Sequence, residues 1–148
     1  MPSKGRVLVV DDEPAIRALV TKIVERAGHP VDSARDGAEA IEKLEQSQYA
    51  VAVLDLMMPN VDGYALIEYM KARGGVRPAI IVISAGDTAA LRRLDGSVVH
   101  SILRKPFDID VLGDLITAAV KSMEETAQEE QERRDVLPFR KSSDSPAC

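Results

Sequence analysis

Short apolar runs alternate with amphipathic helical patterns along most of the 148-residue chain. Five runs rich in β-branched and aliphatic residues are predicted strands: Arg6–Val10, Val31–Ala34, Tyr49–Leu54, Ala79–Ile83 and Val98–Leu103. Five segments with helical periodicity follow them in turn: Pro14–Arg26, Ala38–Leu44, Tyr64–Ala72, Asp87–Leu94 and Ile109–Met123. Apolar runs without polar alternation are typical of strands buried on both faces. The alternation therefore predicts an α/β domain in which helices cover both faces of a parallel sheet.

The end of the chain differs in pattern from this domain, which we place at residues 5–123. Residues 124–134 lose the apolar stripe but keep opposite charges four positions apart, so we expect a charged extension of the last helix. Residues 135–148 mix Pro, Ser and charge, so we expect a disordered tail. The residues after Met123 are too few for an output domain, so we expect a stand-alone module.

Composition argues against several classes of protein. The net charge is −5, and a net-acidic chain lacks the basic surface of a nucleic-acid binder. Aromatic residues make up only 3%, which disfavours a stacking platform for single strands. The single cysteine, Cys148, cannot form an internal disulfide, and no apolar run is long enough for a signal peptide or a membrane span. We therefore expect a cytoplasmic protein.

Polar residues stand where four of the five predicted strands end. Ligands of open α/β sheets bind beyond the carboxyl ends of the strands, so these residues should gather at one edge. They are Asp11, Asp12 and Glu13 after the first strand, Asp55 after the third, Ser84 at the end of the fourth and Lys105 after the fifth.

The carboxylates in this group suggest a cation site. If Asp11, Asp12 and Asp55 lie about 5 Å apart, each ionised pair costs about 3 kcal/mol at an effective dielectric constant of about 20. Such a cluster raises a pKa or holds a cation, and carboxylate oxygens completed by water suit Mg²⁺. The plainer interpretation is that Asp12 caps the helix beginning at Pro14 and that Asp11 is a solvated loop residue.

Asp55 favours the functional interpretation, because an acid at the end of a buried strand is costly unless it is used. A carboxylate beside Mg²⁺ can act as a nucleophile toward a phosphoryl group. Lys105 could pair with a carboxylate or a phosphoryl oxygen, and the Ser84 hydroxyl could donate to a phosphoryl oxygen.

Four ordered motifs resemble the receiver domain of bacterial two-component response regulators: Asp11-Asp12, LDLMMPNVDG from Leu54 to Gly63, Ser84-Ala85 and Lys105-Pro106-Phe107. The resemblance covers roughly residues 5–121. It implies a flavodoxin-like (CheY-like) fold, a doubly wound five-stranded parallel sheet of order 2-1-3-4-5 with five helices. It implies a phosphoacceptor signalling domain rather than a true enzyme.

The same resemblance assigns a role to each site residue. Asp55 matches the phosphoacceptor, Asp11 and Asp12 match the acid pair that serves Mg²⁺, and the Met57 backbone carbonyl matches a further metal ligand. Ser84 and Lys105 match the hydroxyl and the lysine that act on the phosphoryl group, and Lys105-Pro106 matches a cis peptide. The implied partners are a histidine kinase or a histidine phosphotransfer protein and a downstream protein target, with no nucleic acid and no membrane. We expect a monomer or a weak dimer.

Two features depart from the family pattern. Ile102 stands where the family often has a rotating Tyr or Phe, so a hydroxyl-and-aromatic relay is not expected. Met57 and Gly86 occupy the two positions that commonly modulate dephosphorylation, and neither side chain can orient a water by hydrogen bonding. We therefore predict a phosphoryl group that lasts on the order of minutes or more rather than seconds.

Four other functions fit less well. An aspartate-nucleophile phosphatase would need a second acid where Met57 stands, and a dinucleotide site would need a glycine-rich loop where Asp-Asp-Glu stands. His29 lies in a turn and His100 in a strand, so a phosphohistidine carrier is not expected. A phosphorylation-independent scaffold with the same fold remains the main alternative.

Overall fold

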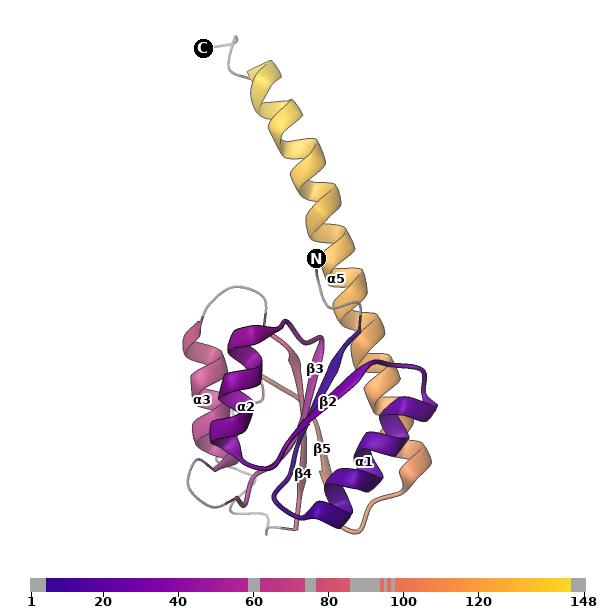
Figure 1. Ribbon diagram of the computed structural model, residues 1–148. Coiled ribbons are helices and arrows are strands. Elements are labelled where there is room, and N and C mark those ends of the chain that lie inside the picture. The colour runs from indigo at the N-terminus through magenta and orange to yellow at the C-terminus, as the bar shows by residue number, and fades with distance from the viewer. Residues whose placement is uncertain are drawn as a thin grey trace.

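A five-stranded parallel sheet forms the centre of the domain, in the order β2-β1-β3-β4-β5 (Figure 1). The computed structural model describes residues 5–58, 62–73, 77–85, 94, 96 and 98–144, with residues 127–144 described by their backbone alone. The strands are β1 (Val7–Val10), β2 (Val31–Ala34), β3 (Val51–Asp55), β4 (Ala79–Ser84) and β5 (Val99–Arg104). All four neighbouring pairs are parallel, so the predicted sheet and its strand order are confirmed.

Helices cover both faces of this sheet. The helices among the described residues are α1 (Pro14–Arg26), α2 (Gly37–Gln46), α3 (Gly63–Arg73) and α5 (Ile109–Asp144). Figure 1 shows α2 and α3 on one face and α1 and α5 on the other. The fifth helix that we predict, over Asp87–Leu94, lies outside the described residues except for Leu94.

The sheet divides the core into two apolar layers. Leu8 and Val10 of β1 point into the layer beneath α2 and α3, where Leu66 and Met70 of α3 are buried with them. Val7 and Val9 point into the opposite layer, beneath α1 and α5. Alternate side chains of a strand face opposite sides of the sheet, so a strand buried on both faces must be apolar throughout. This is why the uninterrupted apolar runs predict central strands correctly.

Two local signals define α1. Pro14 stands at its first turn, where a missing backbone N–H costs nothing, and Glu13 is the N-cap residue. Gly28 follows the helix with φ of +90°, a conformation that glycine adopts without strain. The bounds of α1 and β2 match the predicted ones, whereas β3 begins at Val51 instead of Tyr49.

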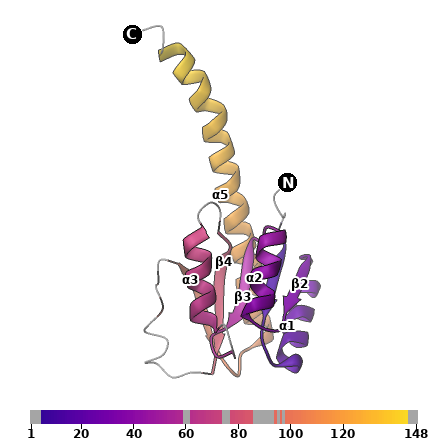
Figure 2. The same cartoon turned by 60° about the vertical axis from the view of Figure 1, so that its left-hand side comes forward.

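Helix α5 is far longer than the domain needs. Its backbone stays helical through Asp144, including residues 135–144, where the sequence predicts a disordered tail. Adding a residue to an existing helix avoids the cost of nucleation, which favours continuation beyond the packed part. Figure 2 shows the end of α5 leaving the domain as a single rod. Among the described residues, no helix is both long enough and apolar enough to cross a membrane.

Candidate functional site

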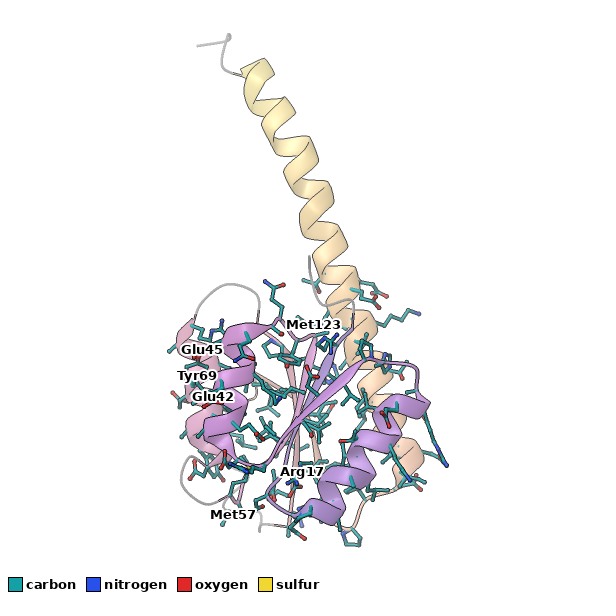
Figure 3. The ribbon with its side chains drawn as sticks, in the orientation of Figure 1. Arg17, Glu42, Glu45, Met57, Tyr69 and Met123 are labelled. Atoms are coloured by element: carbon teal, nitrogen blue, oxygen red, sulfur yellow. The ribbon has the colours of Figure 1, made fainter. Side chains whose placement is uncertain are left out.

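The carboxyl ends of β1, β3, β4 and β5 meet at one edge of the sheet, and the predicted site residues lie there. In Figure 3 this edge is at the bottom, where Arg17 and Met57 are labelled, and Met123 lies at the opposite end of the domain. Parallel pairing brings Asp55 at the end of β3 beside Ile83 of β4, and Ser84 of β4 beside Arg104 of β5. The parallel topology itself therefore brings together residues that are up to 94 positions apart.

Three carboxylates form a tight cluster at this edge. Oxygen atoms of Asp11, Asp12 and Asp55 all lie within 4.8 Å of one another. Asp11 and Asp55 are only 3% and 4% exposed, whereas Asp12 is more accessible to solvent. Burial raises the pKa of Asp11, although a backbone hydrogen bond and the nearby Lys105 act in the opposite direction. Three carboxylates this close together favour the binding of a cation.

The turn after β1 holds Asp11 in place. Its Oδ1 accepts a hydrogen bond from the Glu13 N–H at 2.9 Å, and its backbone carbonyl accepts one from Arg17 Nη1 at 2.9 Å. Asp11 is therefore not a solvated loop residue, and the N-cap of α1 is Glu13 rather than Asp12. These observations remove the plainer interpretation of the acid pair.

Asp55 is held by the turn that follows β3. Its Oδ1 accepts a hydrogen bond from the Met57 N–H at 3.1 Å. Leu56 turns into the core at 1% exposure, whereas the Met57 side chain is 62% exposed beside the site. Gly63 at the start of α3 donates its N–H to the Leu56 carbonyl at 2.9 Å, which joins the start of α3 to the residue that follows β3.

Lys105 connects the acidic residues to β5. Its Nζ lies 3.2 Å from Asp55 Oδ2, 3.3 Å from Glu13 Oε1 and 3.4 Å from Asp11 Oδ2. Burial by itself lowers the pKa of Lys105, but the surrounding carboxylates outweigh it, so the pKa is raised and the ammonium stays charged. The Lys105-Pro106 peptide is cis, as the resemblance implies.

The other residues singled out in the sequence differ in how exposed they are. Ser84 is 1% exposed, and its carbonyl accepts the Lys105 N–H at 3.0 Å. Ile102 is 41% exposed on the edge strand β5. Gly86 lies outside the described residues.

Two contacts at the site were not anticipated from the sequence. Glu13 reaches Lys105, and Arg17 reaches the Asp11 carbonyl. The only sequence signals for them were the position of Glu13 directly after the acid pair and the position of Arg17 one helical turn later.

The fold and the site together define an α/β domain with an acidic pocket at the carboxyl edge of its sheet. The family model for the response regulator receiver domain matches residues 7–117. The chain therefore belongs to the response regulator receiver domain family. Members of this family are phosphoacceptor signalling modules and not conventional enzymes, and the acidic cluster is typical of their Mg²⁺ site.

Individual relatives agree with this assignment. The chain is 33% identical over 108 residues to the transcriptional regulatory protein TcrA of Mycobacterium tuberculosis, covering 72% of this chain and 42% of TcrA. It is 31% identical over 136 residues to the transcriptional regulatory protein FixJ of Bradyrhizobium diazoefficiens, covering 92% of this chain and 66% of FixJ. The chain thus spans less than half the length of TcrA.

A solved structure supports the same conclusion. A response regulator signal receiver domain from Bermanella marisrubri is similar to this chain with a TM-score of 0.72 and 35% sequence identity. The match covers 78% of this chain and 98% of that structure, so the likeness extends over a whole receiver domain.

Proposed function

We propose that this chain accepts a phosphoryl group on Asp55 from a phosphohistidine, with Mg²⁺, and signals through protein contacts in a two-component phosphorelay. The observation that carries this proposal is the environment of the Asp55 carboxylate. One oxygen is held by the Met57 N–H and the other by the Lys105 ammonium, within 4.8 Å of two further acids. A buried carboxylate positioned in this way beside a cation site is arranged as a nucleophile.

The acidic cluster fits Mg²⁺ by its donor atoms. Carboxylates of Asp11, Asp12 and Asp55 would hold the ion together with the Met57 backbone carbonyl, and water would complete the shell. When bound, the ion would offset negative charge on the transferred phosphoryl oxygens.

The residues of this chain divide the work of the transfer. An Asp55 oxygen forms a bond to phosphorus while the bond from phosphorus to the donor imidazole breaks, and the imidazole leaves with the electron pair. Lys105, already 3.2 Å from Asp55, neutralises a phosphoryl oxygen. The Ser84 hydroxyl donates to another phosphoryl oxygen.

The lifetime of the product follows from the residue beside Asp55. A thioether such as that of Met57 cannot orient a water by hydrogen bonding, and Gly86 has no side chain to do so. We infer that the acyl phosphate lasts on the order of minutes or more. A half-life of a few seconds for the isolated protein would contradict this inference.

The partners we propose are a histidine kinase or a histidine phosphotransfer protein and a downstream protein target, in the cytoplasm. Receiver domains interact with histidine kinases, which supports the first of these partners. The names of TcrA and FixJ describe transcriptional regulation, which is a property of those longer proteins. For this chain we propose signalling by protein contact, as a monomer or weak dimer.

The test is phosphorylation by acetyl phosphate, scored by intact mass and by a phosphate-affinity gel. Wild type should gain one phosphoryl group only when Mg²⁺ is present, and Asp55→Asn should gain none. Asp110→Asn is the matched control, because it removes one exposed carboxylate from the first turn of α5 and should behave like wild type.

The alternative is a receiver-fold scaffold that works without phosphorylation. One observation favours it: Ile102 is 41% exposed where the family often has an aromatic switch, so the coupling of phosphorylation to an output surface lacks its usual residue. A folded protein that neither gains a phosphoryl group nor binds Mg²⁺ would support the scaffold.

A further inference from the structure

We propose that Glu13 is a positioning residue that restrains Lys105 in the unphosphorylated protein and so slows phosphorylation of Asp55. This inference rests on the proposed function and adds a regulatory residue to the same site. Glu13 is neither the phosphoacceptor nor a member of the acidic cluster defined by Asp11, Asp12 and Asp55.

The direction of the Glu13 side chain is the first observation. Glu13 is the N-cap of α1, a position where a short polar side chain usually accepts a hydrogen bond from the helix. Its side chain makes no such bond. Instead, Oε1 lies 3.3 Å from the Nζ of Lys105, a residue 92 positions further along the chain. The side chain of Glu13 is therefore directed at the site and not at its own helix.

The second observation is that one ammonium serves three carboxylates. Lys105 Nζ lies within 3.4 Å of Asp55, Glu13 and Asp11 at the same time. An ammonium has three donors and no acceptor, so these carboxylates already use its full capacity. A phosphoryl oxygen on Asp55 can gain Lys105 only if an existing partner gives up its contact.

The exposure of the three carboxylates identifies which of them gives up its contact with Lys105. The side chains of Asp11 and Asp55 are 4% and 6% exposed, whereas that of Glu13 is 59% exposed. Water can solvate the released Glu13 carboxylate, whereas an unpaired carboxylate in the pocket would be costly. The phosphoryl group therefore displaces Glu13 from Lys105. The ion pair between Glu13 and Lys105 contributes to the barrier to phosphorylation.

We predict that Asp55 is phosphorylated faster when the ion pair between Glu13 and Lys105 is removed. Glu13→Gln should raise the rate of phosphorylation by about two- to fivefold, the range expected for one partly exposed ion pair. The surface position of Glu13 means that folding should be unaffected, which a circular dichroism spectrum and a thermal midpoint would verify.

A second variant separates position from charge. Glu13→Asp keeps the charge but shortens the side chain by one methylene, so the carboxylate no longer reaches Lys105. If position matters, Glu13→Asp should be accelerated like Glu13→Gln. If only the local negative charge matters, it should react like wild type, and the proposal is overturned.

Two phosphodonors of different charge distinguish the release of Lys105 from simple electrostatic repulsion between Glu13 and the donor. Acetyl phosphate and phosphoramidate should be accelerated by the same factor in Glu13→Gln, since the release of Lys105 is common to both. A larger gain for the more anionic donor, or no gain beyond that of Asp110→Asn, would contradict the proposal.

Wild type that takes up no phosphoryl group from either donor would overturn the proposed function and, with it, this inference. Phosphorylation of wild type without acceleration in the variants would overturn the inference alone.

Discussion

Tyr49 forms a buried polar contact outside the acidic site. It is 6% exposed, and its hydroxyl donates to Asp32 Oδ2 at 2.7 Å. Asp32 also accepts from Arg6 Nη1 at 3.4 Å. Burial raises the pKa of the Tyr49 hydroxyl, and the neighbouring Asp32 carboxylate raises it further. The contact joins the segment just before β3 to the edge strand β2.

This raised pKa predicts a loss of stability at alkaline pH. In the unfolded chain Tyr49 ionises at about pH 10, whereas in the folded protein it stays protonated to higher pH. The contribution of Tyr49 is therefore complete below about pH 10 and is lost as the pH rises above it. Urea unfolding at pH 9 and pH 11 should show that wild type loses about 1 kcal/mol more than Tyr49→Phe. Equal losses in the two proteins would contradict the prediction, because all other ionisable groups are common to both.

Individual residues of the site were predictable to different degrees. Asp11, Asp55 and Lys105 could be predicted, because strand ends can be located from apolar runs and parallel strands end at one edge. The contact between Glu13 and Lys105 could not, because it depends on the direction of a long side chain that the backbone pattern does not determine. The residue types at the strand ends suggested a cation site and a carboxylate nucleophile, whereas the specific role of each residue came from the resemblance to receiver domains.

At the scale of the elements, the position of the site depends on how closely α3 packs against the end of β3. A Cβ added to Gly63 would lie 2.5 Å from Leu56 Cα and 2.7 Å from the Asp55 carbonyl oxygen. Both are backbone atoms, so neither can move without displacing the residues that follow the strand. Only glycine allows α3 to begin this close to Asp55.

Gly63→Ala should therefore damage both stability and phosphorylation. We expect a loss of about 1–3 kcal/mol in the free energy of unfolding, as for other overpacked sites, together with slower phosphorylation of Asp55. Gly113→Ala is the matched control in α5, where the added Cβ meets only Ile23 Cγ2 at an ordinary 3.5 Å. It should stabilise the protein by about 0.5–1 kcal/mol, because alanine favours a helix interior. Urea unfolding measures both changes, and equal effects in the two variants would contradict the argument.

The elements most reliably predicted were those whose side chains are buried by packing. Strands β1 and β3 are apolar on both faces, so their positions followed from composition. The end of α5 could not be predicted in the same way, because the apolar stripe that indicates a packed helix ends at Met123 while the helix continues. The order of the strands came from the family resemblance, because periodicity contains no information about which strands are neighbours.

For the whole molecule, we expect that the domain does not depend for its stability on the rod, the part of α5 from residue 124 to Asp144. Among the α5 side chains that the structure describes, those of Leu112, Ile116, Ala119 and Val120 are buried, whereas residues 124–126 are exposed. A chain that ends after Thr126 should therefore unfold within about 2 °C of the full chain and accept a phosphoryl group at the same rate. Its circular dichroism spectrum should lose helical signal. A fall of more than about 5 °C in the midpoint would mean that the rod stabilises the domain.

The rod makes α5 a lever. An α-helix rises 1.5 Å per residue, so the segment from residue 124 to Asp144 extends about 30 Å beyond the packed part. The first turn of the same helix begins four residues after Lys105, at the end of the sheet where the acids gather. A tilt of about 5° around the level of Met123 would sweep the far end through about 3 Å, a displacement larger than the movement at its base. Any tilt of α5 at the packed part of the helix would therefore become a larger displacement at its far end, because the helix is continuous to Asp144.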